Sequence, residues 1–69
     1  MLIGKRLKEL REKNDMSLKD LSEKSGVQIA TLSRIENLKM TGTINSHLSI
    51  AKALSVELVD LYADANHEE

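Results

Sequence analysis

The sequence predicts an all-α domain of five short helices, and three observations support this fold class. The chain contains no proline, the residue that interrupts helices most strongly. It is rich in Leu, Lys and Glu, which favour helix. Its apolar residues recur at intervals of three and four, the spacing of one helix face, and no segment alternates as a half-buried strand would. A chain of 69 residues has room for one small domain.

The first predicted helix covers Ile3–Lys13. Ile3, Leu7 and Leu10 fall on one of its faces and are expected to be buried. Two polar residues then end the helix. The charged residues on its other side are expected to face the solvent: Lys5, Arg6, Lys8, Glu9 and Glu12.

The second predicted helix, Leu18–Lys24, begins at a recognisable cap. Ser17 is a favourable N-cap residue, and Asp20 follows three residues later, close to the capping-box pattern. Gly26 accepts the left-handed conformation that a sharp reversal after the helix requires.

The third predicted helix covers Gln28–Glu36 and follows that turn directly. Leu32 and Ile35 share its inner face, while the small Ser22 permits close approach of the preceding helix. The spacing of a small residue, a glycine, a leucine and an isoleucine is typical of a helix-turn-helix unit. The alternative interpretation is an ordinary hairpin of two short helices.

The remaining chain predicts two more helices after a polar loop over Asn37–Thr43. The threonine is a plausible N-cap for a helix at Ile44–Leu54. Its inner face is predicted to hold Ile44, Leu48, Ala51 and Leu54. A fifth, short helix is predicted around Leu58, Leu61 and Tyr62. We expect residues 1–62 to form the domain and residues 63–69 to form a short, polar, acidic tail.

The charge of the chain differs between its two parts. Its net charge is −1. Residues 1–39 contain nine Lys or Arg and six Asp or Glu, a net charge of +3, whereas residues 40–69 contain one Lys and five Asp or Glu, a net charge of −4. The positive part contains the predicted helix-turn-helix unit. Because the local field steers a ligand more than the total charge does, the balance does not exclude DNA.

Several kinds of site are not expected. The chain has no cysteine, hence no disulfide, thiolate metal site or thiol nucleophile. Tyr62 is its single aromatic residue, which argues against base stacking on single-stranded nucleic acid. Ser, Asp and His occur in no catalytic spacing, so we expect no enzyme, no cofactor and no metal site. His47 is expected at the edge of the core or at an interface. The N-terminus lacks an apolar run, so a soluble cytoplasmic protein is expected.

Three segments, in this order along the chain, carry a family pattern: Leu18–Val27 (LKDLSEKSGV), Thr31–Asn37 (TLSRIEN) and Ile50–Tyr62 (IAKALSVELVDLY). With them, residues 3–62 resemble the Cro and phage-repressor type of helix-turn-helix domain, the XRE family. The resemblance implies a compact five-helix bundle, the lambda-repressor-like DNA-binding domain. It also implies sequence-specific binding of duplex DNA, generally by a dimer, to regulate transcription.

Four positions depart from the family pattern. Leu18 stands where the family often has a glutamine that contacts a phosphate, so that contact is in doubt. Ser22 replaces the usual alanine and still fits. Leu38 stands where glycine is frequent, and His47 stands where leucine is usual.

The resemblance places base recognition on the third helix, whose N-terminal part enters the major groove in this motif. The expected base-reading residues are Gln28, Ile29, Ala30, Thr31, Ser33 and Arg34. Arg34 is the candidate for a bidentate contact to guanine, and Ile29 and Ala30 could meet thymine methyl groups. The expected phosphate-binding residues are Ser17, Lys19, Asn37, Lys39, Thr41 and Thr43.

Two further contacts are expected. By resemblance, Arg11 and Glu36 form a partly buried ion pair that locks the helix-turn-helix unit against the first helix; the alternative is two unrelated solvated charges. A dimer contact is expected at Leu58, Val59, Leu61 and Tyr62, because an apolar residue at position 59 lies outside the buried spacing; the alternative is a single exposed valine.

The function that we infer from the sequence is regulation of transcription. We expect a homodimer that acts as a repressor and binds a pseudo-palindromic operator in double-stranded DNA, with no membrane involved. The alternative is a protein-interaction module of the same fold, of antitoxin or anti-repressor type, which would bind a regulatory protein partner. The salt dependence of binding distinguishes the regulator from the interaction module. Phosphate binding weakens steeply with salt, whereas an apolar protein contact does not.

Overall fold

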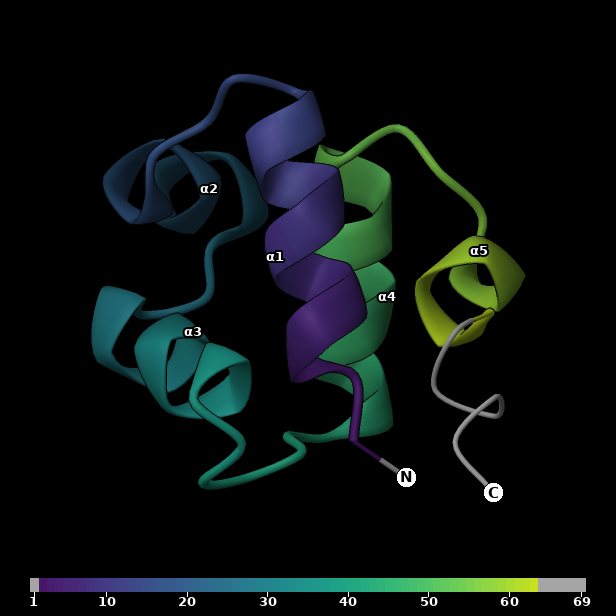
Figure 1. The fold of residues 1–69 in the computed structure, drawn as a ribbon. Coiled ribbons are helices and arrows are strands. Elements are labelled where there is room, and N and C mark those ends of the chain that lie inside the picture. Colours follow the sequence, from purple (N-terminus) through teal and green to yellow (C-terminus); the bar gives the residue numbers. More distant parts are fainter. Residues whose placement is uncertain (1, 64–69) are drawn as a thin grey trace.

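The computed structural model describes residues 2–63 and confirms the all-α fold. It contains five helices (Figure 1). They are α1 (Gly4–Lys13), α2 (Leu18–Ser25), α3 (Ile29–Glu36), α4 (Ile44–Ala53) and α5 (Leu58–Tyr62). Each begins within one residue of the helix start predicted from the sequence. Among these residues, no helix is long and apolar enough to cross a membrane. The tail predicted at residues 63–69 lies almost entirely outside the described residues.

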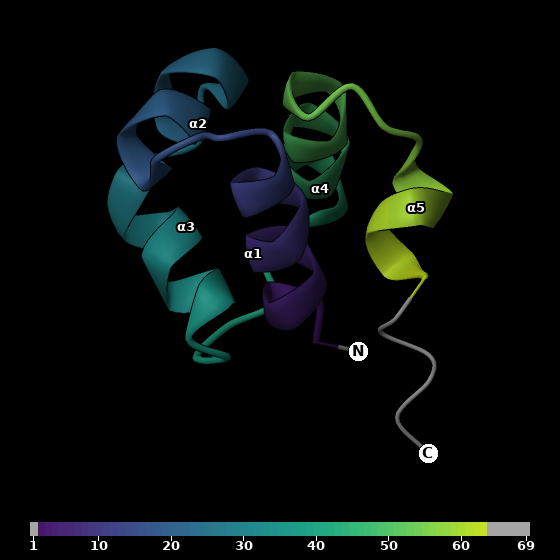
Figure 2. The same cartoon turned by 45° about the horizontal axis from the view of Figure 1, so that its top comes forward.

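Helices α1 and α4 form the centre of the bundle. The α2–α3 pair lies on one side of them and α5 on the other (Figures 1 and 2). Helix α1 contacts α3 and α5, while α4 contacts α2 and α5. The helix-turn-helix pair therefore packs by one side only and leaves its other side to the solvent.

The core is apolar and draws on all five helices. Its largest fully buried side chains are Ile3, Leu7, Leu21, Leu32, Ile35, Ile50, Leu54 and Leu61. The inner faces predicted for the first and third helices are thus buried as expected.

The inner face predicted for α4 is wrong in two positions. Ile44 is 56% exposed and Leu48 is 50% exposed, whereas His47 is only 3% exposed and lies with Ile50 in the interior. Positions 47, 50, 51 and 54 have the same three- and four-residue spacing as the predicted set. The predicted face, which lacks histidine, is one of two faces of α4 that periodicity allows. Packing of α4 between α2 and α5 selects the other face.

Arg6 is a second correction, since it does not lie on a purely solvated face. Its Nε donates a hydrogen bond to the main-chain carbonyl oxygen of Asp60 at 2.9 Å. Its Nη1 lies 3.5 Å from the carboxylate of Glu9 on the same helix. The guanidinium therefore connects α1 to α5, a link between distant segments that helical spacing alone does not indicate.

The predicted cap of α2 is confirmed as a complete capping box. The Ser17 hydroxyl accepts from the Asp20 N–H at 3.0 Å, and the Asp20 carboxylate accepts from the Ser17 N–H at 3.0 Å. These hydrogen bonds to Ser17 favour the charged form and lower the pKa of Asp20 below its ordinary value of 3.8. The carboxylate also suits the positive end of the helix dipole.

Gly4 permits the start of α1 to approach the end of α3 closely. A Cβ atom at this position would lie far inside contact distance of the Ile35 carbonyl oxygen. It would also lie 2.8 Å from Cδ2 of Leu38 and 3.1 Å from Cα of Glu36. Since two of these three atoms belong to the backbone, they cannot rotate away as a side chain would.

Gly4→Ala is expected to destabilise the protein. Helix propensity alone would give a gain of about 1 kcal/mol, but the clash with the end of α3 should outweigh it and cost about 1–3 kcal/mol net. Urea unfolding measures the difference. Lys5→Ala, at the exposed next position of the same helix, is the control and should stay within about 0.5 kcal/mol of wild type. A more stable Gly4→Ala protein would show that α1 and α3 are further apart than described.

The capping carboxylate should make part of the stability depend on pH. Because folding lowers the pKa of Asp20, its contribution is present above its unfolded value and is lost as the pH falls through the folded value. Asp20→Asn should therefore lower the melting temperature at neutral pH, and the gap to wild type should close below pH 3.8. Thermal melts of both proteins from neutral pH to below pH 3.8 measure this difference. A difference in melting temperature that stays constant with pH would contradict a stabilising role of the Asp20 charge.

Candidate nucleic-acid interface

The turn between α2 and α3 is held by short polar contacts. Gly26 has φ = 80° and its N–H donates to the Ser22 carbonyl oxygen. The Ser22 hydroxyl donates to the carbonyl oxygen of Val27 at 2.6 Å, and the Val27 N–H donates to the Ser25 hydroxyl at 3.1 Å. The serine at position 22 therefore does more than leave space, because its hydroxyl joins α2 to the start of the next helix.

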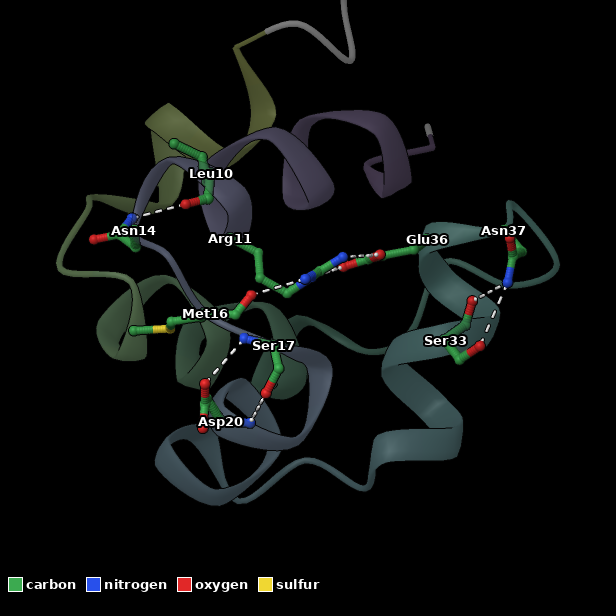
Figure 3. Close-up of polar contacts among 9 residues, drawn as sticks. All are labelled: Leu10, Arg11, Asn14, Met16, Ser17, Asp20, Ser33, Glu36 and Asn37. Carbon is green, nitrogen blue, oxygen red and sulfur yellow. Dashed lines mark hydrogen bonds and ion pairs between the residues drawn. The ribbon is translucent and has the colours of Figure 1, made fainter.

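The inner side of α3 is attached to α1 by an ion pair. Arg11 Nε donates to Glu36 Oε2 at 2.6 Å, and Arg11 Nη2 donates to Glu36 Oε1 at 3.0 Å, a bidentate arrangement (Figure 3). Arg11 Nη1 also donates to the Met16 carbonyl oxygen at 2.8 Å. The two side chains are only 12% and 7% exposed.

The ion pair changes the pKa of Arg11. The hydrogen bonds to the Glu36 carboxylate raise the pKa of Arg11 above its ordinary value, against the opposite effect of burial, and the negative charge of Glu36 adds to the rise. A guanidinium in this position makes a planar two-point contact that a lysine could not reproduce. It sets both the distance and the rotation of α3 relative to α1, so the outward side of α3 is defined.

That outward side carries part of the predicted base-reading set. Ile29 is 47% exposed, Ala30 and Arg34 are exposed, and Ser33 and Thr31 are half-buried. Within the part of the chain that the structure describes, the Arg34 side chain has no hydrogen bond or ion pair. It can therefore extend toward a ligand without breaking an internal contact.

The start of α3 differs from that of α2. Its N-cap residue, Gln28, is exposed and makes no side-chain capping hydrogen bond. The first-turn N–H groups of a helix have no acceptor inside the helix, so those of α3 are available to water or to an anion at the positive end of the helix dipole. Both Gln28 and these amides lie beside the outward residues of α3.

The predicted phosphate-binding residues fall into two groups. Lys19 and Lys39 are exposed cations. The others also have structural roles: the Asn37 amide donates to the Ser33 carbonyl oxygen at 2.9 Å (Figure 3), and Thr43 caps α4 by accepting from the Ser46 N–H. Thr41 is half-buried.

Ser17 is the weakest member of the phosphate set. Its N–H and one lone pair of its hydroxyl are used by the capping box with Asp20. The carboxylate also places a negative charge at the start of α2, where a phosphate would otherwise bind favourably. Only the hydroxyl hydrogen of Ser17 is left for a ligand.

The four residues predicted for the dimer contact do not form one exposed surface. Leu61 is 0% exposed and packs in the core of its own chain, so it cannot contact a partner. Val59 is 69% exposed, and Leu58 and Tyr62 are half-buried. The three-residue spacing of Leu58 and Leu61 places both on the inner face of α5, which accounts for the burial of Leu61.

The comparison with protein families agrees with this geometry. A family model described as helix-turn-helix matches residues 7–61, which include α2, α3, α4 and most of α1 and α5. No curated protein matches the chain.

Glu36→Ala is expected to lower the free energy of unfolding by about 3 kcal/mol, because it leaves the buried Arg11 charge without its partner. The double substitution Arg11→Met, Glu36→Leu removes both charges and should cost clearly less. Urea unfolding of the three proteins measures this. A loss below about 1 kcal/mol in Glu36→Ala would place the pair among exposed salt bridges.

Proposed function

Because the chain belongs to the Cro/C1-type helix-turn-helix family, the XRE family of DNA-binding regulators, we propose that it is a sequence-specific transcriptional repressor. A homodimer would place one α3 helix in each of two major-groove half-sites of a pseudo-palindromic operator. Repression would follow from occupancy of the operator. The protein would act in the cytoplasm, where such an operator is accessible.

The observation that carries the proposal is the outward side of α3. The helix is fixed from behind by Leu32, Ile35 and the Glu36 ion pair, while Ile29 and Arg34 face the solvent. An exposed isoleucine is unfavourable in water, but its methyl groups suit a thymine methyl. The guanidinium of Arg34 suits the O6 and N7 atoms of guanine. A helix held in one orientation can present these two side chains to the edges of the bases.

Phosphate contacts would supply affinity. Lys19 at the start of α2 and Lys39 after α3 are exposed cations. The first-turn amides of α3, which have no side-chain cap, add partial positive charge. Such contacts position the protein on the duplex without reading its sequence, and they make binding dependent on salt.

The dimer would use the exposed part of α5. Val59 offers the largest exposed apolar side chain of this helix, and the half-buried Leu58 and Tyr62 flank it. Two copies related by a two-fold axis would each present the same patch, as a symmetric dimer requires.

A protein-interaction module of the same fold is the second candidate. The observation that favours it is the negative Asp20 at the start of α2, next to Leu18 in place of a phosphate-binding glutamine. An antitoxin or anti-repressor would bind its protein partner through apolar contacts, which salt weakens little. The experiment below separates this candidate from the repressor.

Selection from a random duplex DNA pool tests the proposal. Wild-type protein near physiological salt should enrich a two-fold-symmetric site. Arg34→Ala should relax the preference at one base pair of each half-site, a loss of about 1–3 kcal/mol of discrimination there. Lys52→Ala removes a cation from α4, outside the proposed face, and is the matched control; it should leave the selected site unchanged.

Two outcomes would contradict the repressor. If nothing is enriched and the retained DNA is lost with a little added salt, the protein does not read sequence, and the interaction module becomes the better reading. If Arg34→Ala and Lys52→Ala change the selected site equally, α3 is not the reading helix.

A further inference from the structure

His47 is the one buried polar side chain among residues 2–63. It lies on α4 and is 3% exposed. Its Nε2 is 2.7 Å from the main-chain carbonyl oxygen of Thr41, and its Nδ1 is 2.7 Å from the hydroxyl of Tyr62. Both ring nitrogens are therefore paired, as burial of an imidazole requires.

The partners determine where the proton of the neutral ring lies. A carbonyl oxygen can only accept, so Nε2 carries the hydrogen and donates it to Thr41. Nδ1 is then the acceptor for the hydroxyl hydrogen of Tyr62. The two rings also pack edge to face, with centroids 5.5 Å apart and an interplanar angle of 78°. This packing holds the tyrosine hydroxyl in line with Nδ1.

The contacts of His47 join three segments of the chain. Thr41 lies in the loop that connects α3 to α4, and Tyr62 lies on α5. The loop backbone passes close to the ring, since a Cβ atom at Gly42 would lie 3.6 Å from Nε2 and 3.0 Å from Cδ1 of Ile35. With φ = 87°, Gly42 adopts a left-handed conformation that other residues rarely take. The loop is thus bent over the histidine.

Packing alone does not account for an imidazole at this position. A leucine would fill a similar volume and would need no polar partners, whereas a buried imidazole is unfavourable unless both nitrogens are paired. What the histidine adds is a directed hydrogen bond to the loop backbone. That bond specifies where Thr41 lies relative to α4 and α5.

We propose that His47 is a positioning residue for DNA binding: it anchors the loop that carries Lys39, Thr41 and Thr43 and couples this loop to Tyr62 on α5. The Thr41 carbonyl oxygen fixes the tautomer, and the Tyr62 hydroxyl pairs the remaining ring nitrogen. The inference rests on the proposed function, because it assigns the anchored loop to the phosphate contacts. It also connects the loop to the helix that would form the dimer contact.

Three substitutions in the full chain separate anchoring from packing. His47→Leu keeps an apolar core and removes the anchor. His47→Gln keeps an N–H near the position of Nε2, from which it can donate to the Thr41 carbonyl oxygen. Tyr62→Phe keeps the ring and removes only the hydroxyl. Ser49→Ala, on the same helix but outside this network, is the control.

The measurements are the ring-nitrogen chemical shifts of His47, hydrogen exchange of the loop amides, and binding to the selected duplex at several salt concentrations. Wild type should show the Nε2–H tautomer. His47→Leu should stay folded, exchange its loop amides faster, bind about three- to tenfold more weakly and depend less steeply on salt because a loop phosphate contact is lost. His47→Gln should restore most of the affinity, and Tyr62→Phe should lie between wild type and His47→Leu.

The outcomes distinguish this inference from the function on which it rests. If wild type binds its site and His47→Leu binds equally well with the same salt dependence, His47 only fills the core and the inference is wrong. An Nδ1–H tautomer in wild type would overturn it as well. If wild type selects no DNA site at all, the proposed function fails, and the DNA-positioning role fails with it.

Discussion

The ion pair between Arg11 and Glu36 is the contact on which the proposed DNA-facing side of the molecule depends. The α2–α3 unit has an apolar core side, but apolar packing is not directional and would tolerate a rotation of α3. A bidentate guanidinium–carboxylate contact with almost no solvent exposure is directional. The third hydrogen bond, to the Met16 carbonyl oxygen, extends the same restraint to the segment between α1 and α2. The pair thus contributes orientation more than net stability.

The electrostatic environment differs between the start of α2 and the start of α3, and this difference affects how DNA would be bound. The start of α2 is closed by a capping box that ends in the Asp20 carboxylate, whereas the start of α3 is uncapped. An approaching phosphate backbone would meet repulsion at the first helix start and attraction at the second. Lys19, which directly precedes Asp20 in the chain, offsets part of this repulsion. Affinity would therefore come from the α3 end of the unit and from the loop behind it, which makes the position of that loop important.

Local features were predictable from the sequence alone because they depend on residues near each other in the chain. The helices, the capping box at Ser17 and the turn at Gly26 follow from propensities, side-chain hydrogen bonds to adjacent backbone and the conformational freedom of glycine. The family pattern added Glu36 as the expected partner of Arg11. The exposed residues of α3 followed in turn, because the buried spacing of Leu32 and Ile35 leaves the opposite side outward.

Only the tertiary structure decided features that depend on a choice between equally periodic faces or on segments far apart in the chain. The sequence by itself determined five amphipathic helices and their order, but two faces of α4 share one period, and packing between α2 and α5 selected the face with His47. The close approach at Gly4 and the link from Arg6 to α5 arise in the same way. Local chemistry specifies where a helix lies along the chain; the fit of all the helices together specifies what each side chain contacts.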